Sequence, residues 1–124
     1  LLMAQLAGEF ESMLEDDFCV RTALACPAFS ATFDVQELRR IFDNLISNVQ
    51  KYAAPDNPVM LSISAEDAQL IIRQENAVRK LDVPAEGYQI GLRSIQRIAQ
   101  NYNGRVEVRQ DAEMFAINII LSDI

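Results

Sequence analysis

The hydrophobic positions between residues 34 and 54 repeat with the period of an α-helix. Asp34 is a suitable N-cap, Glu37 stands at the spacing of a capping box, and Pro55 ends the pattern. The pattern predicts one helix of about 20 residues, roughly 30 Å long, with one buried face. The apolar residues of this face are Val35, Leu38, Ile41, Phe42, Leu45, Val49 and Tyr52.

Three polar residues of this helix lie at the edge of the apolar face rather than opposite it. At about 100° per residue, Asn44, Asn48 and Lys51 fall within a sector of roughly 60°. Asparagine has a poor helix propensity, so two asparagines inside one helix need a reason. We interpret the three residues as the rim of a groove. The alternative, a solvated face that carries two amides by chance, stays open on this pattern alone.

Weaker patterns predict the other elements of the chain. We expect a helix over residues 2–15, strands at 18–24 and 29–33, a hairpin of strands at 59–64 and 69–74, a loop over 77–89, a helix over 91–103 and strands at 105–109 and 114–121. Gly104 is expected to end the last helix as its left-handed C′ residue. The order predicts an α/β (α+β) two-layer sandwich with helices packed on one face of a mixed β-sheet.

Length and charge restrict the classes of function. A chain of 124 residues is enough for one domain, and a net charge of −7 argues against nucleic-acid binding, which needs a basic surface. No apolar run is long enough to span a bilayer, so we expect no direct membrane contact by this fragment. The sequence shows no signal-peptide pattern. Its opening Leu-Leu-Met suggests a piece of a longer protein.

Cysteine and histidine offer little chemistry in this chain. Cys19 and Cys26 are its two cysteines, and it has no histidine. This excludes a Cys/His nucleophile and the usual zinc sites. We expect both cysteines to be reduced core residues.

The loop that leads into the last helix has the pattern of an anion site. A helix N-terminus presents unpaired N–H groups and the positive end of the helix dipole, and Gly87 and Gly91 would let the backbone approach a phosphate. The two asparagines of the long helix could offer oxygen ligands to Mg²⁺, and its lysine a charge to phosphate. The glycines alone are a weak signal, since a simple helix-entry turn has the same pattern.

Two motifs resemble those of the histidine-kinase catalytic domains in the GHKL ATPase superfamily. Residues 43–53, Asp-Asn-Leu-Ile-Ser-Asn-Val-Gln-Lys-Tyr-Ala, are similar to the N-box of these domains. Residues 87–98, followed by Tyr-Asn-Gly-Arg at 102–105, are similar to their second glycine box and the helix after it. The resemblance runs from about Phe29 to Leu121, with both boxes in the family's order.

The resemblance implies the Bergerat fold and an ATP site at particular positions. Asn48 would be the principal Mg²⁺ ligand, with Asn44 beside it. Lys51 would reach the phosphates, and Tyr52 would line the nucleotide pocket. Asn76 would face the adenine, residues 77–89 would form the ATP lid, and the backbone at Gly87, Gly91 and Leu92 would cradle phosphate.

The same resemblance implies the catalytic domain of a bacterial two-component sensor histidine kinase, a transferase that uses ATP and Mg²⁺. Residues 16–124 would form the ATPase domain, and residues 1–15 either its own first helix or the end of a preceding dimerisation segment. Without a histidine, the chain cannot autophosphorylate alone. Its partners would be the phosphoacceptor dimerisation domain of the same homodimeric protein and a response regulator. The domain would be the cytoplasmic part of a membrane-bound sensor.

Two departures from the family's motifs leave a second interpretation open. The first glycine box, Asp-x-Gly-x-Gly, corresponds here to Asn-Ala-Val-Arg-Lys at 76–80, which has no glycine, and Gln89 replaces the middle glycine of the second box. Asn76 keeps a carbonyl oxygen that can accept a hydrogen bond but lacks the carboxylate charge. The alternative is a degenerate GHKL domain, a regulatory or protein-interaction platform with weak or no ATP binding.

Overall fold

The secondary structure alternates between helices and strands in an α/β order. The computed structural model describes residues 2–25, 34–66, 69–78, 86–111 and 113–122. The elements within these ranges are α1 (Leu2–Leu14), β1 (Val20–Ala25), α2 (Val35–Tyr52), β2 (Val59–Glu66), β3 (Gln69–Ala77), α3 (Glu86–Asn101), β4 (Arg105–Gln110) and β5 (Met114–Ser122).

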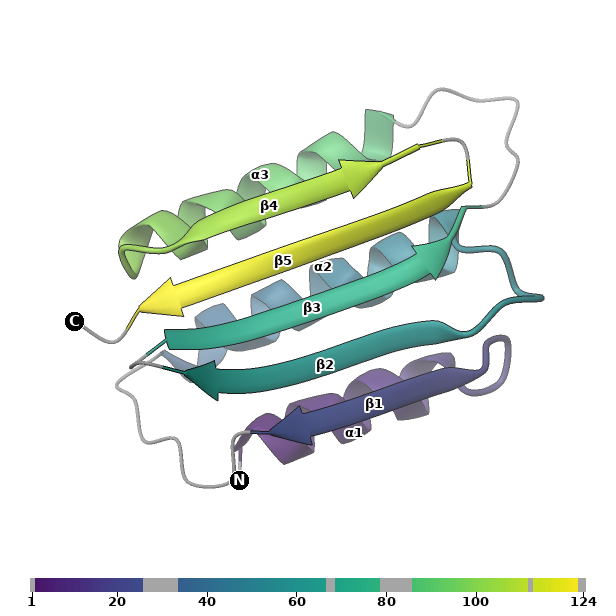
Figure 1. Ribbon diagram of the computed structural model, residues 1–124, viewed down its shortest axis with the longest axis horizontal. Helices are drawn as coiled ribbons and strands as arrows, with labels where there is room; N and C mark the ends of the chain where they lie inside the picture. Colours follow the sequence, from purple (N-terminus) through teal and green to yellow (C-terminus); the bar gives the residue numbers. More distant parts are fainter. Residues whose placement is uncertain (1, 26–33, 67–68, 79–85, 112, 123–124) are drawn as a thin grey trace.

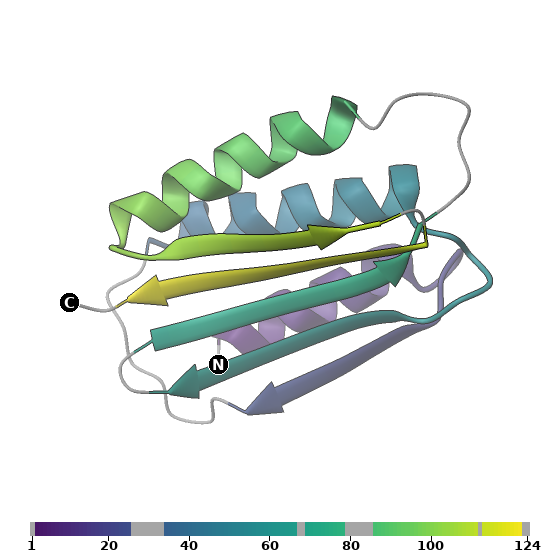
Figure 2. The same ribbon diagram turned by 45° about the horizontal axis from the view of Figure 1, so that its top comes forward.

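The five strands form one mixed sheet, and the helices cover one of its faces. The strand order is β1-β2-β3-β5-β4; β1 pairs with β2 in parallel, and the other neighbours are antiparallel. All three helices lie behind the sheet in Figure 1, and the turned view of Figure 2 shows the same two layers. The predicted two-layer sandwich with helices on one face is confirmed.

The core lies between the sheet and the helices. Along each central strand every second side chain points into it, as the pleat of a strand requires, and helical residues three or four apart fill it from the other side. Its largest fully buried side chains include Phe10, Leu38, Ile41, Leu45, Ile72, Ile95 and Phe115. Since α1 contacts α2 and β1 and contributes Phe10, it shares this core. The division into residues 1–15 and 16–124 stays a prediction.

Several predicted boundaries differ from the structure. The last helix begins at Glu86 rather than at residue 91, and it ends at Asn101. The predicted loop over 77–89 is shorter, because β3 continues to Ala77 and Val78 forms a bridge with Ala53. Two glycines lower the helix propensity of the first turns of α3, which hid its start. The predicted strand at 29–33 lies outside the described residues.

Two side chains expected in the core are exposed. Val35 is 44% exposed at the first position of α2. Cys19 is an exposed free thiol next to β1, so the expectation of a core cysteine is wrong there. Cys26 lies outside the described residues.

Tyr102 joins the end of α3 to the beginning of α2. Its hydroxyl Oη accepts the Asp34 N–H at 2.8 Å and donates to Glu37 Oε1 at 3.1 Å. Asp34 caps α2 by accepting the Gln36 N–H at 2.8 Å, as predicted. The reciprocal bond of a capping box, from the Asp34 N–H to the Glu37 carboxylate, does not form, because the Tyr102 hydroxyl bonds to both groups. Burial, more than the Glu37 carboxylate, raises the pKa of Tyr102.

The turn after α3 depends on Asn103 and Gly104 in different ways. Asn103 adopts the left-handed conformation, with φ of 54°, so it and not Gly104 is the C′ residue. The Gly104 N–H bonds to the Ala99 carbonyl at 2.8 Å and that of Asn103 to Gln100 at 3.2 Å, which is a Schellman motif. Gly104 is needed for another reason: an added Cβ would lie 1.8 Å from the Ile120 carbonyl oxygen on β5.

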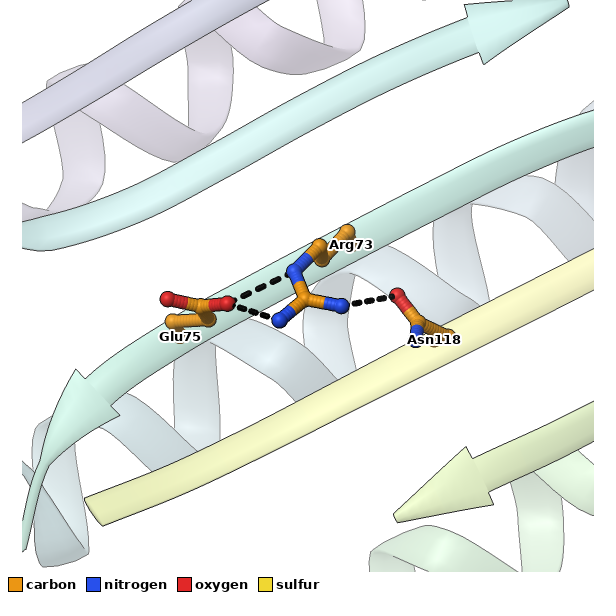
Figure 3. Close-up of polar contacts among 3 residues, drawn as sticks. All are labelled: Arg73, Glu75 and Asn118. Carbon is orange, nitrogen blue, oxygen red and sulfur yellow. Dashed lines mark hydrogen bonds and ion pairs between the residues drawn. The ribbon is translucent and has the colours of Figure 1, made fainter. Parts of the chain in front are cut away.

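The sheet face away from the helices carries a cluster of polar side chains. Figure 3 shows Arg73 of β3 paired with Glu75 on the same strand and, through Nη1, with Asn118 Oδ1 of β5 at 3.2 Å. Arg73 and Asn118 are cross-strand neighbours. This face therefore resembles an ordinary solvated side of an antiparallel sheet, and the candidate site is on the opposite, helical side.

Replacing Gly104 by alanine should destabilise the fold by about 1–3 kcal/mol, because the new methyl group forces the backbone of β5 to move. Gly8→Ala is the matched control, since a Cβ at Gly8 meets nothing within 4 Å. That change should stabilise α1 by up to about 1 kcal/mol. Urea unfolding measures both; equal effects of the two variants would contradict this account.

Tyr102→Phe should lower the free energy of unfolding by about 1 kcal/mol at neutral pH, because it removes two hydrogen bonds at a partly exposed junction. A raised tyrosine pKa means that the fold favours the neutral phenol. The contribution of Tyr102 to stability is therefore complete below the ordinary pKa of 10.0. It is lost as the pH rises through the pKa of Tyr102 in the folded protein. The stability gap between parent and variant should narrow above pH 10; a gap that widens there would contradict the assignment.

Candidate functional site

The polar edge of α2 faces α3. Asn44, Asn48 and Lys51 share one side of the helix with Glu37, about two to four turns away. Glu37 contacts Tyr102 at the end of α3, so this side of α2 is the one turned to α3. The other flank of α2 faces α1, where Arg39 forms an ion pair with Glu9 at 2.8 Å.

The two helices run antiparallel, which decides which parts lie side by side. The beginning of α2 meets the end of α3 at Tyr102. The C-terminal half of α2 therefore lies beside the N-terminal half of α3, as Figure 2 shows. The structure thus brings Asn44, Asn48 and Lys51 to the end of the molecule where α3 begins.

Asn48 is the most unusual of these residues. Its side chain is 5% exposed, yet Nδ2 has no hydrogen-bond partner among the residues that the structure describes. A buried polar group without a partner costs about 1–3 kcal/mol, so it needs an explanation. A half-turn of the amide exchanges N and O, so this position can present a donor or a carbonyl acceptor. Asn44 and Tyr52 are half-buried, and Lys51 is exposed.

The end of β3 supplies a second buried amide. Asn76 is 2% exposed; its Oδ1 accepts from Gln74 Nε2 at 2.8 Å, and its Nδ2 donates to the Ala77 carbonyl at 2.8 Å. Gln74 is fully buried, and in the described part of the chain its Oε1 has no hydrogen-bond partner. Sequence analysis missed Gln74. The signal was available, since Gln74 and Asn76 continue the buried alternation of Leu70 and Ile72.

The ends of α2 and β3 are joined directly. The Ala54 N–H bonds to the Ala77 carbonyl at 2.8 Å, and Ala53 and Val78 form a bridge. Figure 1 shows these ends and the beginning of α3 at the same side of the molecule. Asn48 and Asn76 are therefore carried by elements that meet.

The glycines of the predicted phosphate cradle lie within α3 rather than in a loop. Gly87 is the second residue of the helix, and Gly91 and Leu92 are in its second turn. Within the described residues, the N–H groups of α3 without a helical acceptor belong to its first three residues, 86–88, not to Gly91 and Leu92. The lid expected at 77–89 falls mainly on residues 79–85, which lie outside the described residues, as do the side chains of 86–91.

Two hollows lined by described residues lie away from the polar edge of α2. One, of about 440 Å³, lies between α1 and α2 and is lined by residues that include Glu9, Met13 and Asp43. The other, of about 170 Å³, is on the open face of the sheet beside Arg73. Neither includes the buried amides of Asn48 and Asn76.

The chemistry of the polar edge favours a ligand that brings its own charge. Within the described part of the chain, no three Asp, Glu, Cys or His side chains gather in a way that could hold a metal ion. A divalent cation near Asn44 and Asn48 would therefore depend on amide oxygens and on oxygens of the ligand itself, which suits Mg²⁺ with a phosphate.

In the ranges described, no helix is long and apolar enough to cross a membrane.

The fold defines a class of domain. The structure superposes on the catalytic domain of histidine kinase ThkA, in a nucleotide-free form, with a TM-score of 0.77, and the match covers 98% of this chain and 94% of that one. The two sequences are 10% identical, so this likeness concerns the fold alone. The fold is that of the α/β-sandwich catalytic domains of histidine kinases.

The sequence defines the family. The GHKL domain model matches residues 33–122, and the chain belongs to this family. It is 28% identical over 100 residues to the sensor histidine kinase YrkQ of Bacillus subtilis, covering 81% of this chain and 23% of that protein. It is 34% identical over 68 residues to the sensor protein VanSC of Enterococcus gallinarum, covering 55% and 19%. The chain thus spans less than a quarter of the length of these relatives.

Proposed function

We propose that this domain binds ATP with Mg²⁺ and delivers the γ-phosphoryl group to a histidine on a separate domain. The observation that carries the proposal is the buried amide of Asn48, which lacks a partner on the side of α2 that faces α3. A hydrated cation and a triphosphate would supply the oxygen and water contacts that this amide does not find in the protein.

Each residue of the polar edge has a role in this proposal. Asn48 would be the main Mg²⁺ ligand and Asn44, half-buried one turn earlier, its neighbour. Lys51, exposed one turn later, would meet the phosphates as a point charge, and Tyr52 would line the nucleotide pocket. When bound, Mg²⁺ supplies charge neutralisation of the phosphate oxygens.

The beginning of α3 would complete the phosphate contacts. The free N–H groups of residues 86–88 and the positive end of the helix dipole favour an anion there. Gly87 is among these residues, while Gly91 and Leu92 would support the cradle from the second turn. At the end of β3, Asn76 would accept a hydrogen bond from the adenine amine.

The protein's contribution to phosphoryl transfer would be positioning and electrostatics. Phosphoryl transfer needs little covalent chemistry from the protein, so aligned phosphates and neutralised charge account for most of the effect. Because this chain has no histidine, the acceptor must lie elsewhere. We assign that role to the phosphoacceptor dimerisation domain of the same homodimeric protein, followed by a response regulator, within a membrane-bound sensor whose cytoplasmic part includes this domain.

Calorimetric titration of Mg-ATP into the domain and into Asn48→Ala tests the proposal. The parent should bind with heat exchange, and the variant should lose at least about tenfold in affinity, since one Mg²⁺ ligand is removed. Its melting temperature should be unchanged or higher, because a buried unpaired amide leaves the core. Asn101→Ala, an exposed site at the far end of α3, is the control. If the parent shows no heat of binding at millimolar nucleotide, the result would instead favour the alternative, a regulatory or protein-interaction platform that does not bind ATP.

Lys51→Gln should weaken ATP binding about threefold or more and AMP binding much less, because the lysine meets the outer phosphates. Arg40→Gln makes the same charge change at an exposed site of α2 about 16 Å away along the helix and should leave both affinities unchanged. Displacement of a fluorescent nucleotide measures the ATP and AMP affinities of the parent and of both variants. Equal losses for Lys51→Gln and Arg40→Gln would indicate a general charge effect and no phosphate contact.

A further inference from the structure

Gln74 and Asn76 form a polar pair inside an otherwise apolar surface of β3. Both side chains are at most 2% exposed, and they follow the buried Leu70 and Ile72 on the same face of the strand. The pair is hydrogen-bonded internally at 2.8 Å, and one of its acceptors, Gln74 Oε1, has no partner. A buried orphan acceptor is costly unless something donates to it, so this pair points to a ligand with donors.

The hydrogen bonds of Asn76 lock the orientation of its amide. Oδ1 accepts from Gln74 Nε2, and Nδ2 donates to the Ala77 carbonyl. A half-turn of the amide would place donor against donor and acceptor against acceptor, so it would lose both bonds. Oδ1 keeps a second lone pair for another donor.

This lock matters because an amide and a carboxylate differ in symmetry. A carboxylate offers an acceptor oxygen whichever way it rotates, whereas an amide offers an acceptor in one orientation and a donor in the other. An asparagine that must recognise a donor therefore needs a neighbour that holds its oxygen in place. Gln74 is the side chain that does so here.

We propose that Gln74 is a positioning residue of the nucleotide site: it holds the Asn76 carbonyl as an acceptor and, with its own Oε1, selects a base that carries an exocyclic amine. In this proposal the second lone pair of Asn76 Oδ1 and the Gln74 Oε1, which has no partner among the described residues, accept the two N–H donors of one such amine. A base with a carbonyl at that ring position would oppose two buried acceptors and be rejected. The inference rests on the proposed ATP binding by this domain.

The experiment compares ATP with inosine triphosphate, in which a carbonyl replaces the exocyclic amine. Calorimetry gives the affinity ratio of the two Mg²⁺ complexes for the parent, Gln74→Met and the double variant Gln74→Met/Asn76→Asp. The parent should prefer ATP by about 100-fold or more, and Gln74→Met should reduce this ratio at least about tenfold. The double variant should restore it, because a carboxylate needs no orienting neighbour.

The ratio separates a positioning role from a structural one. A variant that merely loosens the core would weaken both nucleotides alike and leave the ratio unchanged. An unchanged ratio in Gln74→Met would overturn the inference while ATP binding by the parent stands. Absence of any nucleotide binding by the parent would overturn the proposed function as well.

Parent binding alone provides a second measurement in case Gln74→Met does not fold. Purine riboside triphosphate carries hydrogen in place of the amine and removes both donors without adding an acceptor. It should bind the parent about tenfold or more weaker than ATP and tighter than inosine triphosphate. Equal affinity of the parent for all three nucleotides would overturn the inference.

Discussion

Burial of the apolar face of α2 against the sheet is the constraint on which the candidate site depends. Leu38, Phe42, Leu45 and Val49 are almost completely buried, so the helix cannot rotate about its axis without exposing them. Once that rotation is set, the direction of Asn44, Asn48 and Lys51 follows from helical geometry alone. The hydrophobic core therefore aims the polar edge at α3 without any polar contact being needed to hold it.

The second constraint is the contact of Tyr102 with α2, which fixes the position of α3. A single hydroxyl that accepts from Asp34 and donates to Glu37 ties the last turn of α3 to the first turn of α2. The antiparallel arrangement then brings the other end of α3 beside the C-terminal half of α2, the half that carries Asn48. The contact that orients the candidate site is thus at the opposite end of the helix pair.

Sequence reasoning succeeded where one strong local pattern decides the outcome, and it failed where contacts distant in sequence decide. The extent of α2 and the side of its asparagines follow from one helical period. The glycine at 104 is required by the nearby Ile120 carbonyl rather than by a left-handed conformation, which belongs to Asn103, and no local pattern reveals that contact. Gln74 continues the alternation of Leu70 and Ile72, but strand pairing and burial are what show that this face of β3 is the buried one.

The altered glycine boxes and the buried amides are connected by a physical argument. Where the family's motif has glycines and a charged aspartate, recognition can depend on close backbone approach and on a carboxylate that accepts in any orientation. This chain lacks those glycines after Asn76, so under the proposed function side-chain amides would carry more of the recognition, and an amide accepts a hydrogen bond only when its orientation is held. Among the described residues, the amide atoms Asn48 Nδ2 and Gln74 Oε1 are buried and have no hydrogen-bond partner. A buried polar atom without a partner lowers the stability of a fold, so these two atoms support the proposed ligand rather than the core.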